Sequence, residues 1–211
     1  MALSDIDLKY RSGVLTTTKN VAIGGTLSVG GASVVSGGWL PSDHGLISWS
    51  GDPSNATTST ATVNGSVYLV RLNIRYATTI TKVWWCQIGG PTTPTAGQNF
   101  AGLYSSAGAL LSSVNIDAKT GNGPQNATLD AAQAVSAGSF VWAAFMFNAA
   151  TPPTLMKHGG GNAAANIANL TAATARWAVN GTTTGLTALP SSITPPSNSQ
   201  TGVQAFWAAL S

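Results

Sequence analysis

The chain has 211 residues, enough for one domain of ordinary size plus an extension. Its hydrophobic fraction of 44% argues against wholesale disorder, while only 7% of its residues are charged, against roughly 25% in an average globular protein. The net charge of +3 comes from dispersed basic residues, which gives no indication of nucleic-acid binding. Glutamate is absent, and Thr, Ser, Asn and Gly fill the polar positions. These residues favour strands and turns over long helices, so the composition predicts an all-β protein.

The sequence also lacks the usual signals for export and membrane insertion. Its first residues, MALSDIDLKYRSG, have no apolar core of the kind found in a signal peptide, and no apolar run approaches about 18 residues. We therefore expect synthesis in a cytoplasm without membrane insertion. The single cysteine, Cys86, excludes an intrachain disulfide, and its strand-like context VWWCQI predicts a small buried hydrophobe.

Residues 1–19 are the charge-richest stretch of the chain. In this stretch apolar side chains alternate with charged ones, so an extended segment would have one apolar side. Such a segment can add itself as a strand to the sheet of another protein. The alternative is a frayed tail with accidental alternation. We predict a docking arm whose contacts come from Ile6, Leu8, Tyr10 and Arg11.

Residues 20–38 contain two parallel phrases, Ile23-Gly24-Gly25 and Val29-Gly30-Gly31. The alternation of apolar and small residues predicts an extended strand with one face to bury. Glycine, serine and threonine within the segment cannot cover that face, and an isolated ribbon is marginal in water. We predict a short β-stalk in which copies from neighbouring chains wind around a common axis, the alternative being a Gly-rich linker. Its buried face would consist of Val21, Ile23, Leu27, Val29 and Val34.

A head domain is predicted over residues 39–211, after the flexible pair Gly37-Gly38. Trp39 and Trp49 flank its entrance and are predicted to plug the join between stalk and head. Short strands separated by turn clusters follow, and their spacing predicts a two-sheet sandwich of jelly-roll type. We expect strands within 65–77, 79–88, 140–147, 174–179 and 203–210, a hairpin around 106–108, a turn at 136–138, and loops at 89–97, 118–125 and 149–170.

Several short phrases, in order, resemble the C-terminal module of actinobacteriophage virion proteins of the minor tail protein and tail or head fibre type. They are GWLPSDHGLISW, GSVYLVRL, VWWCQI, GQNFAGLYSSAGALL, FVWAAFMFN, TPPT, GLTALPSSITP and FWAALS. The stalk segment NVAIGGTLSVGGASVV is similar to the short β-repeats that precede the heads of trimeric phage fibres. The resemblance covers about residues 20–211. It implies a homotrimeric protein on the virion surface and does not distinguish head from tail.

The residues that could carry catalysis are few. Asp43 and Asp52 lie in a turn-rich segment and could form a carboxylate pair of the glycosidase kind, but turn capping explains both. Asp43 and His44 could be half of a triad or of a metal site, and His158 precedes a glycine run. No nucleophile elbow accompanies them. We predict no catalytic residues, no metal and no cofactor. The alternative is an ion site formed by three copies of His44 on a trimer axis. Without such a site, His44 is expected to be a turn histidine in solvent.

Adjacent tryptophans, Trp84 and Trp85, are the remaining candidates for a binding site. Successive residues of a strand face opposite sides, so one of them is expected in the core. The other would meet a subunit interface or form a sugar platform, and the interface is the more economical reading.

The sequence thus favours a noncatalytic virion structural protein, a short trimeric surface fibre or decoration protein. Residues 1–19 would attach it to capsid or tail proteins. The alternative is an adhesin that binds carbohydrate on the host surface, with its site formed by Trp85 or a neighbour and the 149–170 loop.

Overall fold

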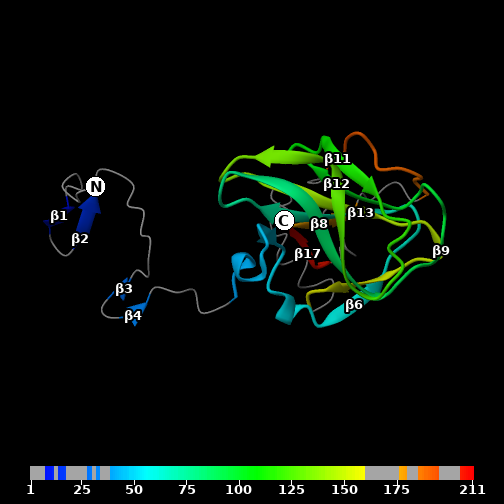
Figure 1. Cartoon of the computed structure of the whole chain (residues 1–211), viewed down its shortest axis with the longest axis horizontal. Helices are drawn as coiled ribbons and strands as arrows, with labels where there is room; N and C mark the ends of the chain where they lie inside the picture. Colours follow the sequence, from blue (N-terminus) through cyan, green and yellow to red (C-terminus); the bar gives the residue numbers. More distant parts are fainter. Residues whose placement is uncertain are drawn as a thin grey trace. The chain divides into compact units, whose positions relative to one another are not determined.

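The computed structural model describes residues 8–11, 14–17, 28–29, 32–33, 39–159, 176–179, 185–194 and 205–211. The chain divides into two compact units, an N-terminal unit (Met1–Gly38) and a head (Trp39–Ser211). Apart from two short 3-10 helices in the head, every regular element in the described residues is a β-strand (Figure 1). The strand pairings are antiparallel, and the prediction of an all-β protein is confirmed.

The N-terminal unit contains two hairpins. β1 (Leu8–Arg11) pairs with β2 (Val14–Thr17), and β3 (Ser28–Val29) pairs with β4 (Ala32–Ser33). The predicted arm is therefore extended over β1 but already paired within its own chain. The predicted stalk ribbon is interrupted, because the chain reverses between Val29 and Ala32. Of the residues predicted for arm and stalk, those outside the described residues are Ile6, Val21, Ile23, Leu27 and Val34, and only the backbone is described at Leu8, Tyr10, Arg11 and Val29.

Two antiparallel sheets form most of the head. The five-stranded sheet has the order β11-β10-β13-β7-β16, and the six-stranded sheet the order β5-β17-β8-β15-β6. The strands of the first are β11 (Leu110–Asn115), β10 (Phe100–Tyr104), β13 (Phe140–Met146), β7 (Val67–Asn73) and β16 (Trp177–Val179). Those of the second are β5 (Ser48–Trp49), β17 (Ala208–Leu210), β8 (Thr78–Gly89), β15 (Thr154–Lys157) and β6 (Thr58–Ala61).

The remaining elements extend these sheets or connect them. β12 (Gly123–Val135) pairs with β8, and the backbone N–H of Ala131 donates to Ser112 Oγ of β11, so β12 contacts both sheets. β9 (Thr92–Pro94) and β14 (Ala149–Thr151) form a separate short pair. The 3-10 helices η1 (Pro41–His44) and η2 (Pro53–Asn55) flank β5.

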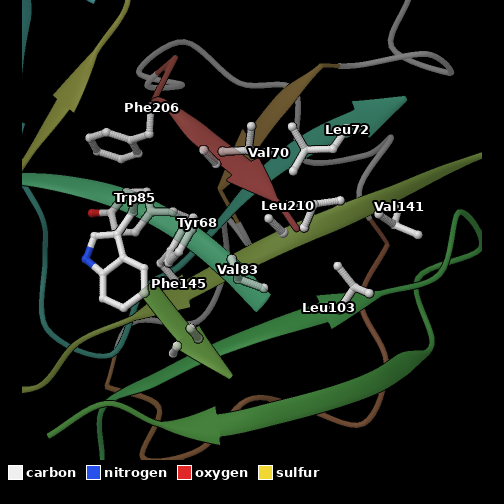
Figure 2. Packing of buried hydrophobic residues seen from close by; sticks show 14 of the residues in the cluster. Tyr68, Val70, Leu72, Val83, Trp85, Leu103, Val141, Phe145, Phe206 and Leu210 are labelled. Atoms are coloured by element: carbon white, nitrogen blue, oxygen red, sulfur yellow. The ribbon is translucent and has the colours of Figure 1, made fainter. Parts of the chain in front are cut away.

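The main hydrophobic core lies between the two sheets. Figure 2 shows side chains from both of them meeting in one cluster, among them Val70 and Phe145 from the first sheet and Val83 and Leu210 from the second. Phe145 lies 5.5 Å from Trp85, measured between ring centroids. Side chains that alternate along each strand and meet across two sheets define a β-sandwich. The sandwich is as predicted, whereas jelly-roll connectivity stays a prediction.

A second core lies on the outer face of the five-stranded sheet. There the segment 185–194 of the same chain covers buried side chains that include Trp142 and Met146, with Leu189 and Ile193 in the same cluster. Tyr104 Oη donates to the backbone oxygen of Pro190 at 2.8 Å. This cover explains why β13 is apolar on both faces, as the run FVWAAFM shows.

Predicted strands and turns agree with the structure in the middle of the chain, whereas the three predicted loops are each wrong in part. β9 lies within the loop predicted at 89–97, and β14 and β15 lie within the one predicted at 149–170, because these short segments pair with each other or with β6 and β8. The strand expected at 140–147 is β13, and the hairpin expected around 106–108 joins β10 to β11 with Gly108 at a φ of 88°. The loop predicted at 118–125 is wrong in its second half, because β12 begins at Gly123. Within β12 only Ala127 and Leu129 are buried among apolar side chains, so its sequence looks polar and irregular.

Candidate functional site

The two aspartates near the start of the head stabilise turns. Asp43 Oδ2 accepts a hydrogen bond from the backbone N–H of Leu40 at 2.8 Å. Asp52 Oδ1 accepts from the N–H of Ser54 at 2.8 Å and from its hydroxyl at 2.7 Å, and caps the N-terminus of η2. The hydrogen bonds from Ser54 lower the pKa of the Asp52 carboxyl group. Each carboxylate is bound within its own turn, as the capping interpretation of the sequence expects.

A serine–histidine pair, which sequence reasoning missed, joins three parts of the head. Ser50 Oγ lies 3.2 Å from His158 Nε2, and it accepts a hydrogen bond from the backbone N–H of Ala208 at 3.1 Å. Ser50 follows β5, His158 follows β15, and Ala208 begins β17. The His158 ring also packs on Gly51, where an added Cβ atom would lie 2.8 Å from Cε1. Residues 108 positions apart gave no local signal of this pairing.

The electrostatics of His158 favour its neutral form. Burial lowers the pKa of the imidazole, and the charge of Arg176 lowers it further. A hydrogen bond with the Asn55 backbone and the charge of Asp52 oppose this shift. A neutral ring can accept the Ser50 hydroxyl proton at Nε2, as in a catalytic dyad. The Ser50 side chain is only 5% exposed, however, and Asp52 bonds to Ser54. The arrangement therefore favours a structural link between strands.

Trp84 and Trp85 face opposite sides of β8, as predicted for adjacent strand residues. Trp85 is fully buried against Phe145 in the core between the sheets. Trp85 is therefore accessible to neither a ligand nor a partner, and its prediction as a ligand-binding or interface residue is wrong. Trp84 lies on the outer face, half-buried, and its Nε1 donates to Ser211 Oγ at 2.9 Å.

Exposed aromatic side chains gather instead at the edge of the head where its sequence begins. η1 brings His44 between two indole rings, at centroid distances of 5.5 Å from Trp39 and 5.4 Å from Trp49. Trp49 is half-buried, whereas Trp39 is 64% exposed. The stack fixes the position of Trp39 without burying it. His44 itself is an exposed residue of a turn.

Beside this stack lies a groove of about 280 Å³, which we call the edge groove. Its residues come from η1 and the segments on either side of it, from the connection between β7 and β8, and from the first residue of β8. Tyr76 is 80% exposed and Leu40 is 42% exposed. With Trp39, they are three of the five large apolar side chains that the described residues expose. The groove is lined by Leu40, Pro41, Ser42, Leu46, Ile47, Arg75, Tyr76, Ala77 and Thr78.

The edge groove could be predicted only in part from the sequence. Alternation through 65–77 places Tyr76 on the same side as Leu72 and Ile74, which are both buried. β7 ends at Asn73, however, so the alternation no longer governs where Tyr76 points. The position of Trp39 at the entrance to the head was the one usable signal.

The described part of the chain contains no group of three or more His, Cys, Asp or Glu residues placed to hold a metal ion. Within the same residues, none of the helices has the length and apolar character that crossing a membrane requires. No protein-family model and no curated protein matches the chain. Its function is therefore inferred from the edge groove, from the division of the chain into two units and from its sequence.

Proposed function

We propose that the chain is a noncatalytic structural protein of a phage particle, a short trimeric fibre or decoration protein on the virion surface. The observation that carries this proposal is the exposure of Trp39, Leu40 and Tyr76 together at one edge of the head. Large apolar side chains scattered singly over a surface need no explanation, whereas a cluster of them marks an interaction site. Leu40 lies two residues after Gly38, the last residue of the N-terminal unit.

The division of the chain supports separate tasks for its two units. The elements described in the N-terminal unit are short two-stranded pairs, which are marginal alone in water. Association with other copies or with another protein would stabilise them. Residues 1–19 attach the protein to the capsid or tail, and residues 20–38 hold three copies in register. The resemblance of residues 20–211 to phage fibre modules supports the same assignment.

Sedimentation velocity of the full chain tests the oligomer. We expect a trimer, with weaker association after deletion of residues 1–38. A stable monomer in both proteins would contradict the proposal. Immunogold labelling of intact particles then distinguishes a position on the capsid from one on the tail.

A catalytic role is tested separately. We expect no turnover of host cell-wall polysaccharide by the purified trimer. Turnover that is lost on Asp43→Ala would overturn the noncatalytic assignment, because Asp43 is one of the few carboxylates available.

The second candidate function is adhesion to host carbohydrate, and the edge groove is the observation that favours it. Exposed Tyr76 and Trp39 offer ring faces for stacking, and Arg75 offers a hydrogen-bond donor beside them. Trp85, the residue first considered for this role, is buried. Glycan-array binding that is lost on Tyr76→Ala but kept on Val63→Ala would favour adhesion. Val63 is a matched control, since it is 53% exposed and lies outside the groove lining.

A further inference from the structure

The edge groove is tethered close to the end of the predicted stalk. Leu40, its first lining residue, follows Gly38 by two residues. Two extended residues span at most about 7 Å. Three chains that are held together through residues 20–38 must therefore bring their edge grooves near one another, whichever way each head is turned.

The size and lining of the groove favour a side chain as its occupant. Its volume of about 280 Å³ lies just below the roughly 300–1,000 Å³ that is typical of small-molecule sites. The lining includes the apolar side chains of Leu40, Leu46 and Ile47, and Arg75 is its one charged residue. A large aromatic side chain from another protein would bury these three apolar side chains, and its ring could stack on the Arg75 guanidinium.

Trp39 has the properties of such a side chain. It is 64% exposed, and its contact with His44 holds it at the same edge of the head as the groove. Holding a side chain in place before binding reduces the conformational entropy lost on association. Because every copy carries both a projecting tryptophan and a groove, a contact between the two can repeat around a threefold axis and close into a ring.

We propose that the edge groove of each head receives Trp39 from a second copy of this chain, so that the heads contact one another directly around the axis. This inference rests on the proposed trimer and deepens it by identifying the surface through which the heads meet. Tyr76 forms the exposed wall of the groove and is buried by the contact.

The first experiment measures association of the full chain carrying Tyr76→Asp, with Ile88→Asp as a matched control. Ile88 is 45% exposed and lies outside the groove lining, so both changes place a carboxylate on an exposed apolar residue. We expect Tyr76→Asp to raise the concentration at which the trimer dissociates by about tenfold or more, as for a central interface residue. Ile88→Asp should leave it within about twofold. Sedimentation velocity over a dilution series provides both values.

The second experiment traps the contact covalently. In a Cys86→Ser background, the full chain carries Trp39→Cys and Tyr76→Cys together, and each single variant serves as a control. Mild oxidation should produce disulfide-linked dimers and trimers from the double variant on non-reducing gels. Copies linked through unlike positions can extend to a trimer, whereas the single variants can form only dimers.

The outcomes separate this inference from the proposed function. A wild-type trimer that tolerates Tyr76→Asp and forms no cross-links from the double variant would overturn the groove contact and leave the trimer standing. Glycan binding that is lost on Tyr76→Asp in an intact trimer would also overturn it, in favour of a sugar in the groove. A wild-type monomer at every concentration would overturn both proposals.

Discussion

The outer faces of the two sheets are buried to different extents by other parts of the chain. On the five-stranded sheet, segment 185–194 lies over Trp142 and Tyr104 and buries both almost completely. On the six-stranded sheet, Trp49, Trp84 and Cys86 stay half-buried around a smaller buried group that contains Trp207. Trp207 Nε1 donates to the backbone oxygen of Gly51, so the turn after β5 covers part of this face.

This contrast shows that the apolar pattern of a strand does not decide which face becomes a core. Both outer faces carry tryptophans. Because the chain has few charged residues, its sequence does not show which face is exposed to solvent. The outer face of the five-stranded sheet becomes a core because segment 185–194, which is distant in sequence, packs on it. The first face is complete within one copy, whereas the edge of the head near Trp39 is left with exposed apolar side chains.

The largest expected effect comes from removing a tryptophan on the covered face. Trp142→Ala should lower the free energy of unfolding by about 3–5 kcal/mol, because it leaves a cavity under segment 185–194. Trp84→Ala on the other face should cost about 1–2 kcal/mol, since that ring is half-buried and makes one hydrogen bond, to Ser211. Urea denaturation at one fixed protein concentration measures both. Equal losses would remove the distinction between the two faces.

A smaller effect is expected from loosening the cover itself. Tyr104→Phe removes the hydroxyl that donates to Pro190 and leaves the ring in place. We expect a loss of about 1 kcal/mol. Hydrogen exchange should accelerate mainly within 185–194, because that segment loses an anchor to β10. Uniform acceleration over the head would show that the segment does not open independently.

The pH dependence of stability tests His158, which follows β15 of the six-stranded sheet. The pKa of His158 in the folded head lies below its ordinary value of 6.5, so the unfolded chain binds the proton more readily. Stability should therefore be full above about pH 6.5 and decline as the pH falls towards the folded pKa. The chain has two histidines. His158→Gln should flatten this part of the profile, whereas His44→Gln should preserve it. The reverse result would contradict the assignment of this pH dependence to His158.

The smallest effect concerns the reactivity of thiols on the two faces. Burial raises the pKa of Cys86, so its alkylation at neutral pH should be slower in the folded protein than in urea. Ala178→Cys, placed under the covered face in a Cys86→Ser background, should react more slowly still, because Ala178 is 2% exposed. Faster labelling at position 178 than at Cys86 would contradict the cover described for the five-stranded sheet.

Local patterns predicted much of the head because local chemistry determines those parts. The apolar, aromatic run at 140–147 and the Ser-Ala-Gly turns identified β13 and the β10–β11 hairpin. β12 was missed in part because its position depends on pairing with β8, with a break in register between Thr128 and Gln133. The reversal between Val29 and Ala32 was missed because the alternation of apolar residues suggested one continuous ribbon.

The candidate site was harder to predict than the fold. The edge groove joins residues 40–47 to residues 75–78, and no local pattern encodes that meeting. Trp84 and Trp85 illustrate the same limit. Their opposite orientation followed from strand geometry, but which of them enters the core depends on which face of β8 packs against the five-stranded sheet.

The position of β17 also has a consequence for the order of folding. This strand lies between β5 and β8, and the hydrogen bond from Trp207 to Gly51 joins residues that are 156 positions apart. A sheet closed by such distant segments forms slowly and cannot be completed while Leu210 is still within the ribosome. The β1–β2 hairpin closes over only a few residues. Synthesis thus separates the two units in time, because the local hairpin can form before the head has its last strand.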